Sequence, residues 1–142
     1  MIKIRHTGIV TNNLKKSLNF WQKNFKFEIK KDVDESGKTL DKVLMFENIK
    51  VRTLKLCDSN DNLIELLYFN NPKSTLKKNL KTNSIGITHI SVSVKNLKKI
   101  YKDLKKKIRF NSKPLLSADG NVLMTYCRTP EGCFLELVEE IK

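Results

Sequence analysis

The sequence predicts an α+β fold made of two tandem modules, each with the order strand–helix–strand–strand–strand. The first observation behind this prediction is an internal repeat: the stretch from His6 aligns without a gap with the stretch from His89. Both copies carry NLKK at the same place, from Asn13 and from Asn96. A repeat of this kind indicates two copies of one structural unit.

The second observation is an amphipathic helix in each copy. Apolar residues recur at i, i+4, i+7 and i+11, which is the stripe of a helix that buries one face. The stripes are Leu14, Leu18, Trp21 and Phe25 in the first copy, and Leu97, Tyr101, Leu104 and Ile108 in the second. Asn13 and Asn96 precede the stripes, where an Asn side chain can cap free backbone N–H groups.

The remaining segments alternate between strand-like runs and turn signals. In the first copy the strand-like runs are residues 3–10, 27–33, 42–47, 51–56 and 63–69, one more than the four strands of the module order. In the second copy they are residues 87–94, a short stretch within 112–117, and residues 122–127 and 133–139. We therefore expect modules at residues 1–70 and 84–142, joined by the polar linker 71–83. The two modules should form one compact domain, because one alone could not easily bury its sheet face.

Composition limits the classes of function. The net charge of +13 comes almost entirely from lysines spread along the chain, without the interleaved aromatic residues of a nucleic-acid stacking platform. We therefore expect no nucleic-acid partner and a tendency to attract anionic small molecules. No apolar run is long enough to span a bilayer, and the N-terminal residues lack the apolar core of a signal peptide. These features predict a cytoplasmic protein without a membrane partner.

Four polar residues stand at equivalent positions of the two repeats. The only histidines, His6 and His89, lie in the first strand of each module, and Glu65 and Glu136 interrupt the apolar last strands. If the four side chains share a cavity, two imidazoles and two carboxylates suit a divalent metal such as Ni, Zn, Co, Fe or Mn. The alternatives are ordinary core or surface histidines, and glutamates that face solvent or pair with one of the many lysines.

The motifs HTGIVTNNLKKSLNFWQKNFKF, DSNDNLIELLYF, THISVSVKNLKKI and RTPEGCFLELVEE resemble the vicinal oxygen chelate superfamily. This superfamily includes glyoxalase I, epimerases, extradiol dioxygenases and antibiotic-resistance proteins. The resemblance covers nearly the whole chain. It implies a glyoxalase-like cup-shaped mixed sheet around a metal site, and a homodimer.

The set His6, Glu65, His89 and Glu136 is similar to the metal ligands of bacterial-type glyoxalase I (lactoylglutathione lyase). That resemblance implies a lyase or isomerase that converts the hemithioacetal of a 2-oxoaldehyde and a thiol, such as glutathione, into a 2-hydroxyacyl thioester through a metal-stabilised enediolate. Glu136 would be the base and Glu65 the second catalytic carboxylate.

Two positions depart from the glyoxalase I pattern. Val10 stands where an Arg is common and Phe69 where an Asn is common, so the thiol or substrate can differ. The alternatives are another enzyme of the superfamily, an epimerase or a dioxygenase, or a resistance-type protein that binds a small molecule without catalysis.

Overall fold

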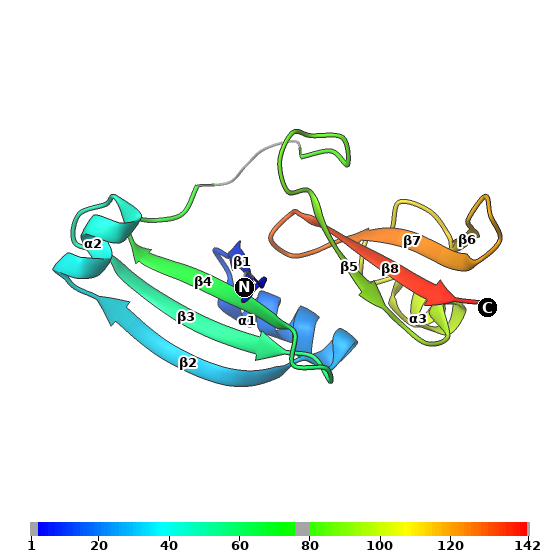
Figure 1. Cartoon of the computed structure of the whole chain (residues 1–142), viewed down its shortest axis with the longest axis horizontal. Helices are drawn as coiled ribbons and strands as arrows, with labels where there is room; N and C mark the ends of the chain where they lie inside the picture. The colour runs from blue at the N-terminus through cyan, green and yellow to red at the C-terminus, as the bar shows by residue number, and fades with distance from the viewer. Residues whose placement is uncertain (1–2, 76–79, 142) are drawn as a thin grey trace. The chain divides into compact units, whose positions relative to one another are not determined.

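The computed structural model describes residues 3–75 and 80–141. The chain divides into two compact units, Met1–Leu76 and Lys77–Lys142. Each unit contains a four-stranded mixed sheet with few helices, as Figure 1 shows. The predicted α+β class is therefore confirmed.

The first unit has its strands in the order β1-β4-β3-β2. Strand β1 runs parallel to β4, and the other two pairings are antiparallel. Helix α1 and its π-helical continuation η1 follow β1, and α1 packs against β4 (Figure 1). The elements are β1 (Thr7–Val10), α1 (Leu14–Leu18), η1 (Asn19–Asn24), β2 (Glu28–Ser36), α2 (Lys38–Leu44), β3 (Lys50–Cys57) and β4 (Leu63–Asn71).

The second unit repeats this arrangement, with the strand order β5-β8-β7-β6. Strands β5 and β8 are parallel, and α3 packs against β8. The elements are β5 (His89–Ser93), α3 (Leu97–Leu104), β6 (Leu115–Leu116), β7 (Val122–Arg128) and β8 (Phe134–Glu140). In both units the first strand thus pairs with the last one, so segments from the two ends of each repeat lie side by side.

Both helices begin at the asparagines that the sequence indicated. The Oδ1 of Asn13 accepts a hydrogen bond from the backbone N–H of Lys16 at 3.0 Å, and that of Asn96 accepts one from Lys99 at 3.3 Å. The first helix differs from the prediction beyond Leu18, because it continues as the wider π-helix η1. The predicted capping is therefore confirmed, and the predicted helix continues through η1 as far as Asn24.

The second helix also ends earlier than its apolar stripe. Helix α3 ends at Leu104, and Ile108 is buried from the turn that follows. Leu97 and Leu104 carry the buried face of the helix itself. An apolar residue at helical spacing can therefore reach the core from outside the helix.

The prediction of a strand at residues 42–47 is wrong, because helix α2 occupies Lys38–Leu44. Gly37 has a φ of 112°, which lets the chain leave β2 sharply, and Met45 ends the helix in the left-handed region. The Oδ1 of Asp41 accepts a hydrogen bond from the backbone N–H of Ile49 at 2.8 Å, which ties the helix to the start of β3. Helix α2 has no buried residue, so its sequence carries no stripe that would identify it.

The linker expected at 71–83 has residues 76–79 outside the described part of the chain. Asn71 belongs to β4, so the last strand of the first unit extends slightly beyond the expected module boundary. Within the described ranges, no helix has the length and apolar content needed to cross a bilayer.

All three cysteines are free thiols. Cys57 and Cys127 are buried, and Cys133 is partly buried. Burial raises the pKa of the Cys127 thiol to about 12. This thiol therefore stays protonated at neutral pH and does not act as a nucleophile.

The N-terminus of α3 is capped from a distant strand. The two carboxylate oxygens of Glu139 accept hydrogen bonds from the backbone N–H groups of Asn96 and Leu97, both at 2.8 Å. Because these bonds are charge-assisted and lie at a helix N-terminus, we expect Glu139→Ala to lower the free energy of unfolding by about 1.5–3 kcal/mol. Chemical denaturation monitored by circular dichroism measures this loss. The neighbouring exposed Glu140 is the matched control; an equal effect of Glu140→Ala would contradict the capping role.

Candidate functional site

The two glutamates of interest alternate with fully or almost fully buried apolar residues along their strands. In β4, Ile64 and Leu66 are buried, and Glu65 between them points to the opposite face. In β8, Leu135 and Leu137 are completely buried, and Glu136 alternates with them. The apolar residues next to each glutamate therefore pack on one side of the sheet and leave the carboxylates on the other.

The strand register gives each glutamate the same relation to a histidine. Gly8 pairs with Glu65 across β1 and β4, and Ser91 pairs with Glu136 across β5 and β8. In both units the histidine stands two residues before the paired residue, which places it on the same face as the glutamate. The repeat found in the sequence is therefore also a repeat of side-chain geometry.

In the first unit, the Nε2 of His6 lies 3.2 Å from the Oε2 of Glu65. Both side chains are partly buried, with exposed fractions of 29% and 14%. The Nδ1 of His6 is buried and has no hydrogen-bond partner among the described residues. The contact with Glu65 is therefore the polar contact that orients this imidazole.

In the second unit, the Nε2 of His89 lies 3.9 Å from the Oε2 of Glu136. The Nδ1 of His89 is 3.2 Å from the Oγ1 of Thr88, and its ring packs edge-to-face against Tyr126. A hydrogen-bond partner on Nδ1 leaves Nε2 as the free nitrogen, which is the usual arrangement of a ligating histidine.

Each pair has the donor set and spacing of two ligands to one divalent metal. Nitrogen and oxygen ligands lie about 2.0–2.2 Å from such a metal, so two ligands at a right angle are about 3 Å apart. The 3.2 Å of His6 and Glu65 matches this value, and the 3.9 Å of His89 and Glu136 requires only a small side-chain shift. Each pair taken by itself therefore has donor atoms and a spacing that fit two ligands of a divalent metal.

Within each unit, the described residues form no group of three or more His, Cys, Asp or Glu side chains placed to hold a metal. The structure thus brings His6 together with Glu65, and His89 together with Glu136.

Sequence reasoning missed one neighbour of each glutamate. Lys55 pairs with Glu65 across β3 and β4, and its Nζ lies 3.6 Å from the Oε1 of Glu65. Tyr126 occupies the corresponding place opposite Glu136, across β7 and β8. Burial, together with the nearby Glu136 carboxylate, raises the pKa of Tyr126. The hairpin turns at residues 58–62 and 129–132 set these registers. Pairing residues outward from each turn in the sequence would therefore have placed Lys55 opposite Glu65 and Tyr126 opposite Glu136.

The different neighbours make the two carboxylates inequivalent. Glu65 has a histidine and a lysine within 4 Å, so the lysine pairing that the sequence left open is present here. Glu136 has a more distant histidine and a neutral phenol. Glu136 is therefore the carboxylate with less cationic stabilisation.

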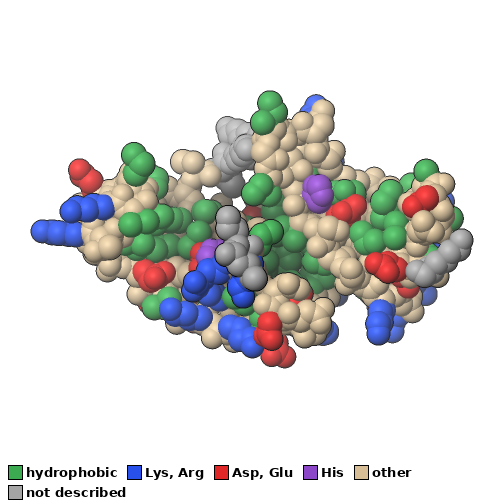
Figure 2. Space-filling model, viewed as in Figure 1, with side chains coloured by type: hydrophobic (Ala, Val, Ile, Leu, Met, Phe, Trp, Pro, Cys, Tyr) green, Lys and Arg blue, Asp and Glu red, His purple; other side chains and the backbone are tan. Residues whose placement is uncertain are grey.

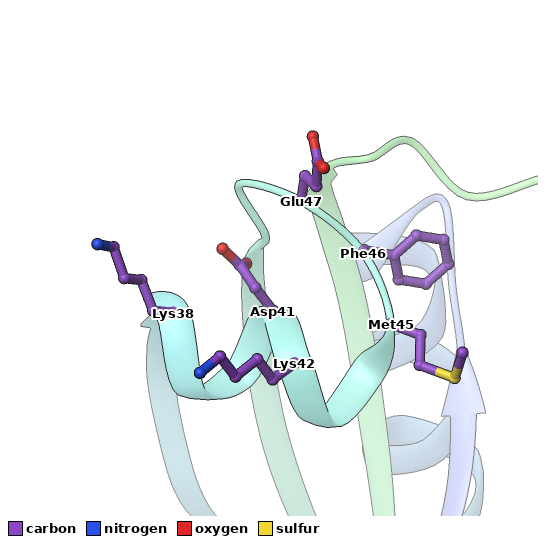
Figure 3. Close-up of a pocket in the computed structure, with 6 residues that line it drawn as sticks. All are labelled: Lys38, Asp41, Lys42, Met45, Phe46 and Glu47. Atoms are coloured by element: carbon purple, nitrogen blue, oxygen red, sulfur yellow. The ribbon is translucent and has the colours of Figure 1, made fainter.

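A cavity opens on the same face of the first unit. Its volume is about 530 Å³, and it is lined by Val10, Phe46, Phe69, Pro72, Lys73, Ser74 and Thr75. Figure 2 shows hydrophobic side chains gathered on the α2 side of this unit, with Lys and Arg side chains at its outer edge. A second, more open hollow of about 720 Å³ surrounds α2. In Figure 3 the ring of Phe46 points away from Lys38 and Lys42, and Phe46 lines both hollows.

Comparisons with solved structures support the fold. A glyoxalase family protein from Bacillus cereus has a TM-score of 0.89 at 16% identity, covering 100% of this chain and 96% of that one. The trypanothione-dependent glyoxalase I of Leishmania major has a TM-score of 0.67 at 18% identity, covering 99% and 88%. A fosfomycin resistance protein from Listeria monocytogenes, crystallised with Mn(II) and sulfate, has a TM-score of 0.66 at 13% identity, covering 98% and 93%.

No curated protein matches the chain. Residues 3–137 match a single family model, which spans both repeats and both His–Glu pairs. The chain therefore belongs to the Glyoxalase/Bleomycin resistance protein/Dioxygenase superfamily.

Proposed function

We propose that the protein is a metal-dependent isomerase of the glyoxalase I type. Its substrate would be the hemithioacetal of a 2-oxoaldehyde and a thiol, and its product a 2-hydroxyacyl thioester. The observation that carries the proposal is the His–Glu pair presented at the same register position of each unit. Two such pairs supply the nitrogen and carboxylate donors that Ni, Zn, Co, Fe or Mn accept.

We propose His6, Glu65, His89 and Glu136 as the ligands of one ion. The two pairs can come from one chain or from two copies in a homodimer. A bound divalent metal would act as a Lewis acid that stabilises negative charge on the substrate oxygens. The excess of lysines favours an anionic substrate.

The proton transfer falls to Glu136 in this proposal. Its carboxylate takes the proton from the carbon that bears sulfur and returns it to the adjacent carbon, while the hydroxyl proton moves to the neighbouring oxygen. The reaction is an isomerisation, so atoms and electrons balance without an oxidant. Glu65 is less suited to be the base, because its two carboxylate oxygens already contact Lys55 and His6.

Two measurements test the proposal. Metal analysis of protein purified without chelators should give about one ion per set of four ligands, and His6→Ala should lower that content. Protein loaded with Ni²⁺ or Zn²⁺ should then form a thioester from glutathione and either methylglyoxal or 2-oxooctanal, followed by absorbance. Full metal retention in His6→Ala would reject the ligand set. The absence of thioester with both metals and both aldehydes would reject the reaction.

A further inference from the structure

The cavity of the first unit lies on the same sheet face as the His6–Glu65 pair. Gly8 and Val10 are two residues apart in β1 and therefore share one face, and Glu65 and Phe69 are four residues apart in β4 and also share a face. A strand rises about 3.3 Å per residue, so along the sheet Val10 lies about 7 Å and Phe69 about 13 Å from the level of Glu65. A molecule bound at the pair can therefore extend along β4 into the cavity.

The lining of the cavity is mainly apolar. Val10 and Phe46 are 47% and 50% exposed, and together with Phe69 and Pro72 they form its walls. The volume of about 530 Å³ is that of a typical small-molecule site. Covering solvent-exposed apolar walls with an apolar group is favourable, because it removes apolar surface from water.

One end of the cavity is polar. The Oγ of Ser74 is buried and has no hydrogen-bond partner among the described residues. Lys73 is the charged residue of the lining, and its Nζ lies 5.7 Å from the centre of the Tyr68 ring. A hydrogen-bond acceptor or an anionic group on a ligand would satisfy both side chains.

The walls are fixed by hydrogen bonds between the loops that carry them. The side-chain amide of Asn71 donates to the backbone carbonyl of Asn48 at 2.7 Å, which joins the end of β4 to the loop after Phe46. Asp41 ties α2 to Ile49 of the same loop. The cavity is therefore largely formed before any ligand binds, which reduces the entropic cost of binding.

We propose that this cavity binds the aliphatic chain of the substrate. The proposal rests on the function proposed above, and it specifies the substrate as a 2-oxoaldehyde whose carbon chain of several methylene groups ends in a hydrogen-bond acceptor or an anionic group, which would meet Ser74 and Lys73. Of the two halves of the hemithioacetal, the aldehyde chain is the apolar one, and it matches the walls formed by Val10 and Phe69. These are the two positions where the sequence departs from the glyoxalase I pattern.

Octanoate is a suitable probe, because its chain matches the walls and its carboxylate matches the polar end. We expect titration of ¹⁵N-labelled full-length protein, without added metal, to shift the amide signals of Val10, Phe46, Phe69 and Ser74. Val10→Arg and, independently, Phe69→Asn should weaken octanoate binding at least tenfold. Ile29→Arg is the control, because Ile29 is similarly exposed (43%) in the same sheet but lies outside the cavity.

The outcomes separate this proposal from the proposed function. Octanoate binding should persist in Glu65→Gln, which removes a metal ligand but no part of the cavity. Shifts that map elsewhere, or wild-type affinity in both Val10→Arg and Phe69→Asn, would overturn the cavity assignment whatever the metal analysis gives. In the active enzyme, Val10→Arg should raise the KM for 2-oxooctanal relative to that for methylglyoxal. An unchanged ratio would overturn the role of the cavity in substrate binding.

Discussion

Glu136→Gln is expected to lower the turnover of the metal-loaded enzyme by about 10²–10⁴-fold, the usual contribution of a general base. The amide keeps the size of the side chain but cannot accept the substrate proton. It also binds a divalent metal more weakly than a carboxylate does, so the metal content should fall. Rates with methylglyoxal and 2-oxooctanal, together with metal analysis of the same samples, measure both effects.

Two comparisons make this result specific. Glu140→Gln removes an exposed carboxylate four residues further along the chain and should leave both turnover and metal content near wild type. Measuring turnover of Glu136→Gln at saturating metal separates the two roles. If Glu136 is the base, turnover stays low when the site is full of metal. If Glu136 is only a ligand, saturating metal restores turnover. Full turnover under saturating metal would refute Glu136 as the base and leave it as a ligand.

Trp21→Ala is expected to have the largest effect on stability. Trp21 is completely buried, and its ring contacts those of Phe20 and Phe27 at centroid distances of 5.2 and 5.3 Å. Removing a buried aromatic side chain of this size costs about 3–5 kcal/mol, because it leaves a cavity as well as losing apolar burial. Amide hydrogen exchange in β1, β3 and β4 should accelerate correspondingly.

Trp21→Phe is the matched variant for this prediction. It retains an aromatic ring in the cluster and should lose clearly less stability than Trp21→Ala. Equal losses in the two variants would mean that the packing of the ring is not what stabilises the unit. Leu115→Ala, at an exposed position of β6, controls for nonspecific effects and should change stability little.

The repeat made much of the fold predictable from the sequence. Once His6 and His89 were aligned, the helix stripes and the Asn caps followed from local chemistry, and the structure has both caps. Along their strands, Glu65 and Glu136 alternate with buried apolar residues, as the two-residue period of a strand requires. These features depend on nearest neighbours along the chain, which a sequence displays directly.

The features that the sequence did not reveal depend on contacts between distant residues. Helix α2 is held by the bond from Ile49 to Asp41 rather than by a buried face, so its apolar residues suggested a strand instead. Lys55 and Tyr126 became neighbours of the glutamates only through the register of the hairpins. The cavity likewise combines side chains from β1, β4 and the loop after α2.

The parallel pairing of β1 with β4 also affects the order in which the protein can fold. Strand β1 is synthesised first, yet its partner in the sheet is the last strand of the unit. Contacts between residues so far apart close a long loop and therefore form late and slowly. His6 accordingly meets Glu65 only after β4 has left the ribosome, and β5 and β8 repeat this delay. In each unit the His–Glu pair is therefore expected to be among the last contacts to form.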